Sequence, residues 1–285
     1  MRYRFLRFPE GKMKAVTLSY DDGVRADLRL AEICDRYGVK CTFNINSERM
    51  NGDGADKLNA AELNANMLAK GHEIAVHGAH HKAPGIVAPT QGIADVLNCR
   101  LALEKAFGTF IRGMAYPDSG ITKMCNGNDY NTIRSYLQAL GIVYSRTLAG
   151  DNNSFRLPTD WYAWMPTAHH NNPNLLKWAD EFCAIKDEGY SAAREPRLFY
   201  LWGHSFEFDR NNNWDVIENF LAKISDREDT WYATNIEIYE YVTAYNSLIS
   251  SADGCTLYNP TLKTIWFWAD EKTYAIQSGE TITVS

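Results

Sequence analysis

The chain has 285 residues, 45% of them hydrophobic and 22% charged, which suits one large α/β domain or such a domain with a small appendage. A net charge of −6 without long Lys/Arg runs excludes the composition typical of nucleic-acid-binding proteins. No apolar run approaches a membrane span, and the N-terminal MRYRFLRFPEGK lacks the apolar core of a secretory signal. The six cysteines are scattered without a C-x-x-C pair, which is typical of reduced thiols. We therefore expect a cytoplasmic protein with neither a nucleic acid nor a membrane as its partner.

Strands and helices are expected to alternate along most of the chain. KAVTLSY at 14–20 has the apolar run of a short buried strand. The same reasoning predicts further strands at 39–46, 72–78, 111–117, 142–147, 196–204 and 230–235. Helices are predicted at 25–38, 59–71, 92–108, 130–141, 173–189, 214–226 and 236–248. About seven such repeats indicate a mostly parallel sheet with helices outside it, either open or closed into a barrel.

After about residue 250 the pattern changes. Residues 250–285 have no helical period and predict three short strands separated by turns. We therefore divide the chain into a barrel domain at 1–249 and a small β appendage at 250–285. The appendage is expected either to pack on the barrel as a cap or to present Trp266 and Trp268 to a ligand.

Polar residues lie where the predicted strands end. Asp21 and Asp22 follow the first strand, and His77, Arg146 and His204 follow later ones. Because the carboxyl ends of parallel strands meet at one edge of the sheet, where such folds carry out chemistry, we expect these side chains to converge.

The adjacent carboxylates of Asp21 and Asp22 repel each other. A fold keeps such a pair near its core only if something neutralises one of the charges or uses both. His77 and His81 are four residues apart, a spacing that lets two imidazoles converge on one metal. Two imidazoles and one carboxylate hold a divalent metal and leave coordination positions open. The second carboxylate then remains free to act as a base, and the metal charge offsets the repulsion.

With these residues in place, the chain resembles the polysaccharide deacetylase family, the NodB-homology domains of carbohydrate esterase family 4. TLSYDDG resembles the family motif T-F-D-D-G, and HGAHH resembles H-[ST]-x-x-H with Gly78 at the Ser/Thr position. MAYPDSG resembles F-A-Y-P-x-G, TDWY resembles D-x-x-D-W with Leu157 at the first Asp, and LWGH resembles L-x-H. The five motifs follow the family order, and the resemblance implies an irregular (β/α)7 barrel of the polysaccharide deacetylase type.

The resemblance also implies roles for individual residues. Asp22, His77 and His81 would hold one divalent metal ion, with zinc expected first and cobalt, nickel, manganese or iron as alternatives. Asp21 would be the general base, and His204 the general acid that protonates the leaving group. The residues expected to line the substrate site, with the Asp118 N–H as oxyanion donor, are Tyr116, Pro117, Asp118, Asp160, Trp161 and His170.

One departure from the family pattern concerns the base. The third motif of the family often carries an arginine that orients the base aspartate, and this chain has Ala115 there. We hypothesise that Arg146, at the end of another strand, supplies the guanidinium. His169 and His170 have no counterpart in the general family pattern. Three interpretations remain open: the pair borders the substrate cleft, it tunes the acid His204, or it lies on a solvent-exposed loop.

The resemblance implies a metal-dependent hydrolase that removes N- or O-acetyl groups from a carbohydrate, acting on carbon–nitrogen bonds other than peptide bonds or as a carbohydrate esterase. A cytoplasmic location favours a small acetylated sugar or an oligosaccharide as the substrate. Two alternatives remain open. The first is hydrolysis of a cyclic ureide or another non-sugar amide, and the second is a catalytically inactive barrel that binds glycans.

Overall fold

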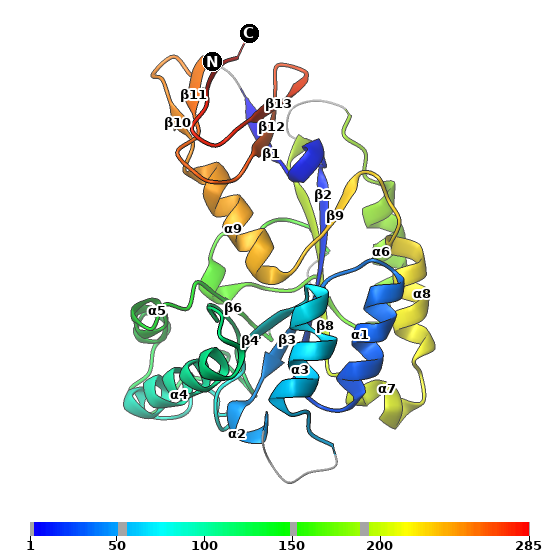
Figure 1. Ribbon diagram of the computed structural model, residues 1–285, viewed down its shortest axis with the longest axis vertical. Helices are drawn as coiled ribbons and strands as arrows, with labels where there is room; N and C mark the ends of the chain where they lie inside the picture. The colour runs from blue at the N-terminus through cyan, green and yellow to red at the C-terminus, as the bar shows by residue number, and fades with distance from the viewer. Residues whose placement is uncertain (1–2, 51–55, 149–152, 189–193, 285) are drawn as a thin grey trace.

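Strands and helices alternate through the computed structural model, which describes residues 3–50, 56–148, 153–188 and 194–284 (Figure 1). The strands are β1 (Arg4–Arg7), β2 (Lys14–Asp21), β3 (Cys41–Ile45), β4 (Glu73–Val76), β5 (Gly113–Ala115), β6 (Tyr144–Arg146), β7 (Ala168–His169), β8 (Arg197–Gly203), β9 (Thr230–Tyr232), β10 (Ile249–Ser250), β11 (Thr256–Tyr258), β12 (Ile265–Ala269), β13 (Lys272–Ile276) and β14 (Thr281–Thr283). The α-helices are α1 (Ala26–Arg36), α2 (Ser47–Met50), α3 (Ala60–Asn66), α4 (Pro89–Phe107), α5 (Tyr130–Ala139), α6 (Leu175–Ala184), α7 (Phe206–Asn211), α8 (Asp215–Ile224) and α9 (Asn235–Asn246). Three 3-10 helices are η1 (Pro9–Gly11), η2 (Leu68–Lys70) and η3 (Trp161–Ala163).

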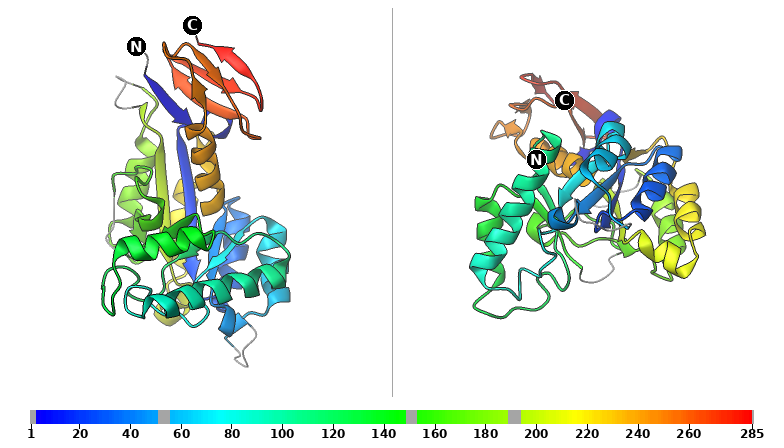
Figure 2. Two further views of the ribbon diagram at one scale, coloured as in Figure 1. Left: turned by 90° about the vertical axis from the view of Figure 1, so that its left-hand side faces the viewer. Right: turned by 60° about the horizontal axis from the view of Figure 1, so that its bottom comes forward.

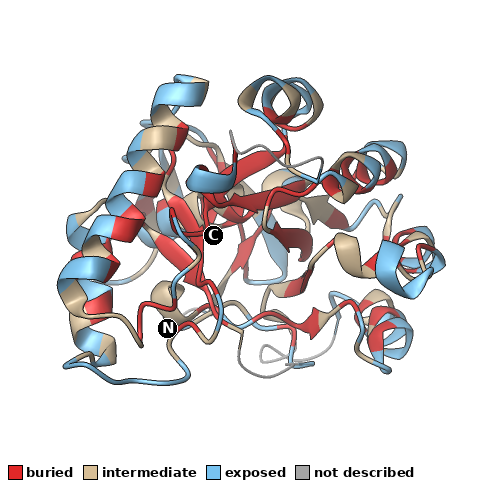
Figure 3. Ribbon diagram, turned by 90° about the horizontal axis from the view of Figure 1, so that it is seen from below, coloured by how far each residue is buried: buried red, intermediate tan, exposed pale blue. Residues whose placement is uncertain are grey.

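The central sheet is parallel and has the strand order β6-β5-β4-β3-β2-β8-β7, with β9 paired to the first half of β2. All eight residues of β2 are buried, because helices cover the outside of the curled sheet and side chains fill its inside. Figure 3 shows the buried strands at the centre and helices with exposed outer faces around them. The predicted irregular (β/α)7 barrel is confirmed.

A short irregular segment closes this barrel. Trp164 forms a parallel bridge with Arg146 of β6, and the Thr147 N–H donates to the Trp164 carbonyl at 2.9 Å. A few residues later, the Thr167 N–H donates to the Tyr200 carbonyl of β8 at 2.8 Å, and β7 pairs with β8. Residues 164–169 therefore join the two edges of the sheet, and this explains why the barrel is irregular: one strand position is filled by a segment of only two paired residues.

Local sequence explains where several helices begin and end. α3 begins at a capping box in which Asn59 and Glu62 bond each other's backbone N–H groups, and Thr234 and Glu237 do the same for α9. The helix predicted at 59–71 is divided: α3 ends at Asn66, η2 follows, and Gly71 ends the run in the left-handed region with φ +82°. The short elements α2, α7 and β7 carry too few residues for a periodic signal.

The two ends of the chain share one small β layer at the top of Figure 1, and the left view of Figure 2 shows both termini there. β1 pairs with β12 in the sheet β1-β12-β13, while β10, β11 and β14 form a second sheet. Trp268 is 9% exposed and Trp266 is partly buried. The backbone N–H of Trp266 donates to the Tyr241 hydroxyl of α9. The layer thus packs on α9. The predicted appendage at 250–285 shares its sheet with β1, which comes from the N-terminal end of the chain. The division into two domains after residue 249 stays a prediction.

None of the helices in the described ranges has the length and apolar character needed to cross a bilayer.

Candidate metal and catalytic site

The polar residues at the strand ends converge at the carboxyl edge of the barrel, which faces the viewer in Figure 3. Asp21 ends β2, Arg146 ends β6, and His77 and His204 directly follow β4 and β8. The parallel register of β2 with β3 and β8 brings these ends together, as expected from the sequence.

Asp22, His77 and His81 form a group of candidate metal ligands at this edge, with their candidate ligand atoms within 4.8 Å of one another. The Asp22 Oδ1 lies 3.9 Å from His77 Nε2 and 3.6 Å from His81 Nε2. His77 Nδ1 lies 2.9 Å from the Ala115 carbonyl, so Nδ1 carries the proton and the Nε2 lone pair faces Asp22. Within the described residues, Asp22 Oδ1 and His77 Nε2 are buried without a hydrogen-bond partner. Such atoms fit a divalent cation.

A tight turn places Asp22 beside this group. Asp22 has φ +87° and Gly23 has φ +64°, so the chain leaves β2 abruptly. A non-glycine residue in this region carries strain of about 1–3 kcal/mol, which the surroundings must hold. The Asp22 N–H donates to the Asn44 carbonyl at 3.0 Å, and a Cβ on Gly23 would lie 2.9 Å from Ile45 Cδ1. The turn therefore needs glycine at 23 and fixes the Asp22 carboxylate towards the histidines.

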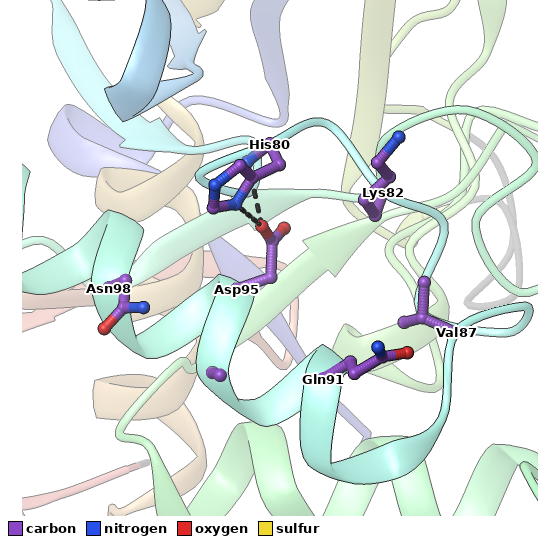
Figure 4. Close-up of a pocket in the computed structure, with 7 residues that line it drawn as sticks. His80, Lys82, Val87, Gln91, Asp95 and Asn98 are labelled. Atoms are coloured by element: carbon purple, nitrogen blue, oxygen red, sulfur yellow. Dashed lines mark hydrogen bonds and ion pairs between the residues drawn. The ribbon is translucent and has the colours of Figure 1, made fainter.

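Asp95 of α4 holds the loop between the candidate ligands His77 and His81, and Figure 4 shows its contact with His80 in that loop. Its Oδ1 accepts hydrogen bonds from the His80 N–H at 2.8 Å and lies 2.9 Å from His80 Nδ1, and its carbonyl accepts from the Ala79 N–H at 3.2 Å. A Cβ at Gly78 would lie only 2.4 Å from Asp95 Oδ2. This contact accounts for glycine at the position where the family motif has Ser or Thr, because the Asp95 carboxylate occupies that space. His80 and Asp95 also line a pocket of about 340 Å³.

Asp21 is a buried carboxylate that is held in its ionised form. It lies 2.5 Å from Arg146 Nη2, and Asn44 donates to its Oδ1 at 2.8 Å. Burial opposes its ionisation, but the charge of Arg146, with those of His77 and His204, outweighs burial and lowers the pKa of Asp21. A carboxylate kept charged beside the metal-ligating group is suited to accept a proton.

Arg146 makes the contact with Asp21 that the sequence analysis proposed. Its side chain is fully buried, and its guanidinium lies over the Trp202 ring with 4.2 Å from Cζ to the ring centroid. Stacking on Trp202 fixes the guanidinium plane while one nitrogen points at Asp21. The guanidinium thus contacts Asp21 from the end of β6, while Ala115 ends the neighbouring strand β5.

His204 faces Asp21 and is held from behind by Glu207. The distance from His204 Nε2 to Asp21 Oδ2 is 3.9 Å, and Nδ1 lies 3.2 Å from Glu207 Oε1. Burial disfavours the imidazolium, but Glu207, Asp21 and Asp22 together raise the pKa of His204. Glu207 was not predicted from the sequence, because its one signal is its position three residues after His204 on the short helix α7.

Glu207 is also the centre of a histidine cluster. His170 Nε2 lies 3.1 Å and His169 Nε2 lies 3.7 Å from Glu207 Oε2, and the Asn171 side chain donates to the same oxygen at 2.5 Å. These interactions outweigh the burial of Glu207 and lower its pKa. His170 is buried against the rings of Tyr20 and Phe208, which rules out the exposed-loop alternative for this residue. Its role in substrate binding stays a prediction.

His169, His170 and Glu207 are close enough together to resemble a second metal site. However, burial, together with the charge of His170, lowers the pKa of His169 to about 4, so its ring is neutral. The Asn171 N–H donates to His169 Nδ1 at 3.1 Å, which places the proton on Nε2, the atom that faces Glu207. That nitrogen turns a hydrogen rather than a lone pair towards Glu207. The cluster therefore surrounds the Glu207 carboxylate, and Asn171 donates the hydrogen bond to its Oε2.

The substrate residues expected from the sequence fall into two groups. Tyr116 and Pro117 are buried directly after β5, and Asp118 is exposed with φ +51°. Among the described residues, the Asp118 N–H donates to no other group, which leaves it free for an oxyanion.

Asp160 and Trp161 lie in a different environment. Asp160 accepts from the Tyr130 hydroxyl at 2.6 Å, and the Trp161 ring packs edge-on against Trp164 and Tyr239 of α9. The Trp161 ring thus packs against the hydrophobic cluster that includes Ala15 of β2 and Ile238 of α9, whereas Asp160 contacts Tyr130 of α5. Their role in substrate binding stays a prediction.

A family model for polysaccharide deacetylase matches residues 8–142. Among solved structures, a protein from Mycobacterium smegmatis described as a polysaccharide deacetylase aligns with a TM-score of 0.57 and 18% identity, covering 86% of this chain and 96% of that one. A family 4 acetyl xylan esterase from Clostridium thermocellum, in complex with cobalt, aligns with a TM-score of 0.50 and 16% identity over 79% and 90%. An allantoinase aligns with a TM-score of 0.57 and 12% identity over 82% and 91%. No curated protein sequence matches the chain.

At these identities the solved structures show the fold alone, and the allantoinase shares it as well as the deacetylase does. The family model adds the sequence evidence, and its range contains Asp21, Asp22, His77 and His81. The matched sequence and the shared barrel agree: residues 8–142 of this chain match the polysaccharide deacetylase family, and the fold is the one seen in its solved structures.

Proposed function

We propose that this protein is a metal-dependent deacetylase that removes N- or O-acetyl groups from a carbohydrate. The observation that carries the proposal is a pair of buried atoms without a hydrogen-bond partner among the described residues, Asp22 Oδ1 and His77 Nε2, with His81 beside them. The Ala115 carbonyl fixes the tautomer of His77 that turns a lone pair towards Asp22. These three side chains would hold the cation, with zinc as the first expectation for two imidazoles and a carboxylate.

When bound, a divalent cation supplies Lewis-acid polarisation of the acetyl carbonyl and lowers the pKa of water. Asp21, kept ionised by Arg146, accepts the proton of the attacking water at its carboxylate. His204 donates a proton from Nε2 to the leaving oxygen or nitrogen, while Glu207 holds Nδ1. The Asp118 N–H stabilises the oxyanion. Base and acid thus come from different strands, and each is held by its own charged partner.

Metal content and acetate release test the proposal together. We expect about one divalent ion per wild-type chain by elemental analysis, and acetate release from a panel of acetylated sugars and oligosaccharides. Asp22→Ala should lose both, because it removes the carboxylate ligand. Glu228→Ala, an exposed carboxylate outside the site, is the matched control and should lose neither.

The other outcomes separate the alternatives. If the protein bound metal and hydrolysed a cyclic ureide but released no acetate, its substrate would be a small amide rather than a carbohydrate. Metal with neither activity would favour an inactive barrel that binds glycans. A chain that takes up no metal under metal-replete conditions would remove the mechanism altogether.

Glu207→Gln is expected to shift the alkaline limb of the kcat profile to lower pH. The active acid is protonated His204, so activity falls as the pH rises through its pKa. Glu207 is among the groups that raise this pKa, and its loss lowers it. Acetate release measured from pH 5 to 10 checks this, with Glu228→Gln as the control. An unchanged alkaline limb would contradict the assignment of Glu207 as the partner of His204.

Asp95→Ala is expected to weaken metal binding by about 10- to 100-fold, the usual effect of removing a group that supports ligand residues. The reason is the loss of the hydrogen bond that Asp95 accepts from the His80 backbone, between the two histidine ligands. Calorimetric titration with zinc measures the Kd directly. Asn98→Ala, exposed on the same helix and lining the same pocket, should leave the Kd unchanged. A wild-type Kd for Asp95→Ala would show that the loop holds its own shape.

A further inference from the structure

Asp27, in the first turn of α1, is a buried carboxyl group that the proposed mechanism does not use. It is 0% exposed, and each of its carboxyl oxygens has a partner. The Val24 N–H donates to Oδ2 at 3.0 Å, and the Ser205 hydroxyl lies 2.5 Å from Oδ1. Val24 comes two residues after Asp22, and Ser205 directly follows His204. One carboxyl group therefore bonds both to the turn that carries a candidate metal ligand and to the segment that carries the acid.

The bond to Ser205 joins two segments at a point where the central sheet no longer pairs them. The parallel register of β2 with β8 ends one residue before Asp21 and His204. Beyond that point the chain leaves β2 for α1 and leaves β8 for α7, and these two helices are neighbours (Figure 1). The hydrogen bond between Asp27 and Ser205 lies past the last paired residues, where it limits the movement of the acid relative to the turn.

The carboxyl group of Asp27 is largely neutral at pH 7. Burial is the main cause that raises its pKa, and the negative charges of Asp22 and Asp21 add to this effect. The hydrogen bonds from Ser205 and Val24 act in the opposite direction, yet the pKa of Asp27 rises to about 8. A neutral acid places no third negative charge near Asp21 and Asp22. Asparagine reproduces this arrangement, because its amide oxygen accepts from Val24 and its NH2 group donates to Ser205.

We propose that Asp27 is a positioning residue that holds the acid His204 in place relative to the turn that carries Asp22. Its bond to Ser205 acts on the acid, and its bond to Val24 acts on the turn. The inference rests on the proposed function, since it assigns a shared partner to the acid and to a metal ligand of that site.

The test measures two quantities for each variant: acetate release at saturating zinc, and the Kd for zinc by calorimetric titration. Asp27→Ala removes both hydrogen bonds, so it should lower kcat by about 10- to 100-fold and weaken zinc binding by a similar factor. KM should stay near the wild-type value, because neither bond acts on the binding of substrate. Ser205→Ala removes only the bond to the acid segment, so it should lower kcat by about tenfold and leave the Kd unchanged.

Three further variants separate positioning from a general loss of structure. Asp27→Asn is the conservative variant and should keep kcat and the Kd near the wild-type values, because the amide retains both hydrogen bonds. The double variant with Asp27→Ala and Ser205→Ala should have the kcat of Asp27→Ala alone, because both changes break the same bond. Glu32→Ala, at an exposed carboxylate on the same helix, is the matched control and should change neither quantity. Urea unfolding of each variant identifies any that fails to fold, and if Asp27→Ala does so, Asp27→Asn and Ser205→Ala decide the outcome.

Wild-type kcat in both alanine variants would overturn the inference while leaving the deacetylase in place. Losses that multiply in the double variant would also overturn it, because Asp27 and Ser205 would then act separately. A folded Asp27→Asn as defective as Asp27→Ala would do the same, since the hydrogen bonds would not account for the loss.

If the wild type binds zinc but releases no acetate, the proposed function fails, and the zinc Kd alone tests the role of Asp27. A weaker Kd for Asp27→Ala, with wild-type values for Asp27→Asn and Glu32→Ala, would support positioning at the metal site without that activity. An unchanged Kd for Asp27→Ala would overturn the inference, as would a wild type that neither binds zinc nor releases acetate.

Discussion

Asp21→Asn is expected to lower kcat for acetate release by about 10²- to 10⁴-fold, the usual contribution of a positioned general base. The amide cannot accept the proton of water, while its shape and its contact with Asn44 remain available. Metal content should stay near that of the wild type, because Asp22, His77 and His81 form the ligand group without Asp21. Rate assays at saturating substrate, with elemental analysis of the same preparation, measure both effects.

The contrast with Asp22→Ala makes this prediction specific. The two aspartates are neighbours, yet one variant should lose catalysis with the metal retained and the other should lose the metal itself. If Asp21→Asn lost the metal as fully as Asp22→Ala does, Asp21 would be a ligand rather than the base. If it kept near wild-type kcat, another group would take the proton.

Arg146→Ala is expected to lower the free energy of unfolding by about 3–5 kcal/mol, as when one partner of a buried ion pair is removed. Asp21 would be left 1% exposed without its main opposite charge, and the guanidinium stacked on Trp202 would be lost. The activity should also fall, because the pKa of Asp21 rises and its orientation loosens. Urea unfolding at neutral pH and kcat/KM for acetate release provide the two readouts.

Arg112→Ala is the matched control, since Arg112 forms a 3.5 Å ion pair with Glu240 that is exposed on both sides. Its loss should cost less than about 1 kcal/mol. Because the pKa of Asp21 is lowered in the folded protein, the stability from the Arg146 pair is present above the ordinary carboxyl pKa. This stability is lost as the pH falls through the lowered pKa of Asp21. The gap between wild type and Arg146→Ala should therefore narrow in acid. A loss below 1 kcal/mol at neutral pH with unchanged kcat/KM would refute the role of Arg146.

The sequence alone determined the features that depend on local spacing. Alternating apolar runs and helical periods are set by neighbouring residues, so the parallel α/β barrel and most of its strands were predictable. The convergence of the candidate metal ligands was predictable as well, because His77 and His81 are four residues apart and Asp22 directly follows a strand that ends at the same edge. Arg146 lies 125 residues from Asp21, and it was inferred only because a strand end at the correct edge carried a guanidinium.

Partners that come from distant or short elements could be identified only from the packed fold. Glu207 lies on a helix of six residues, too short for a periodic signal, and its carboxylate matters because β7 brings His170 against it. Asp95 explains Gly78 only once α4 packs against the loop after β4. β1 joins β12 across nearly the whole chain, a pairing that no local pattern contains. Sequence periodicity specifies which elements form and which face each one buries, whereas the contacts between side chains of different elements depend on how the packed barrel brings them together.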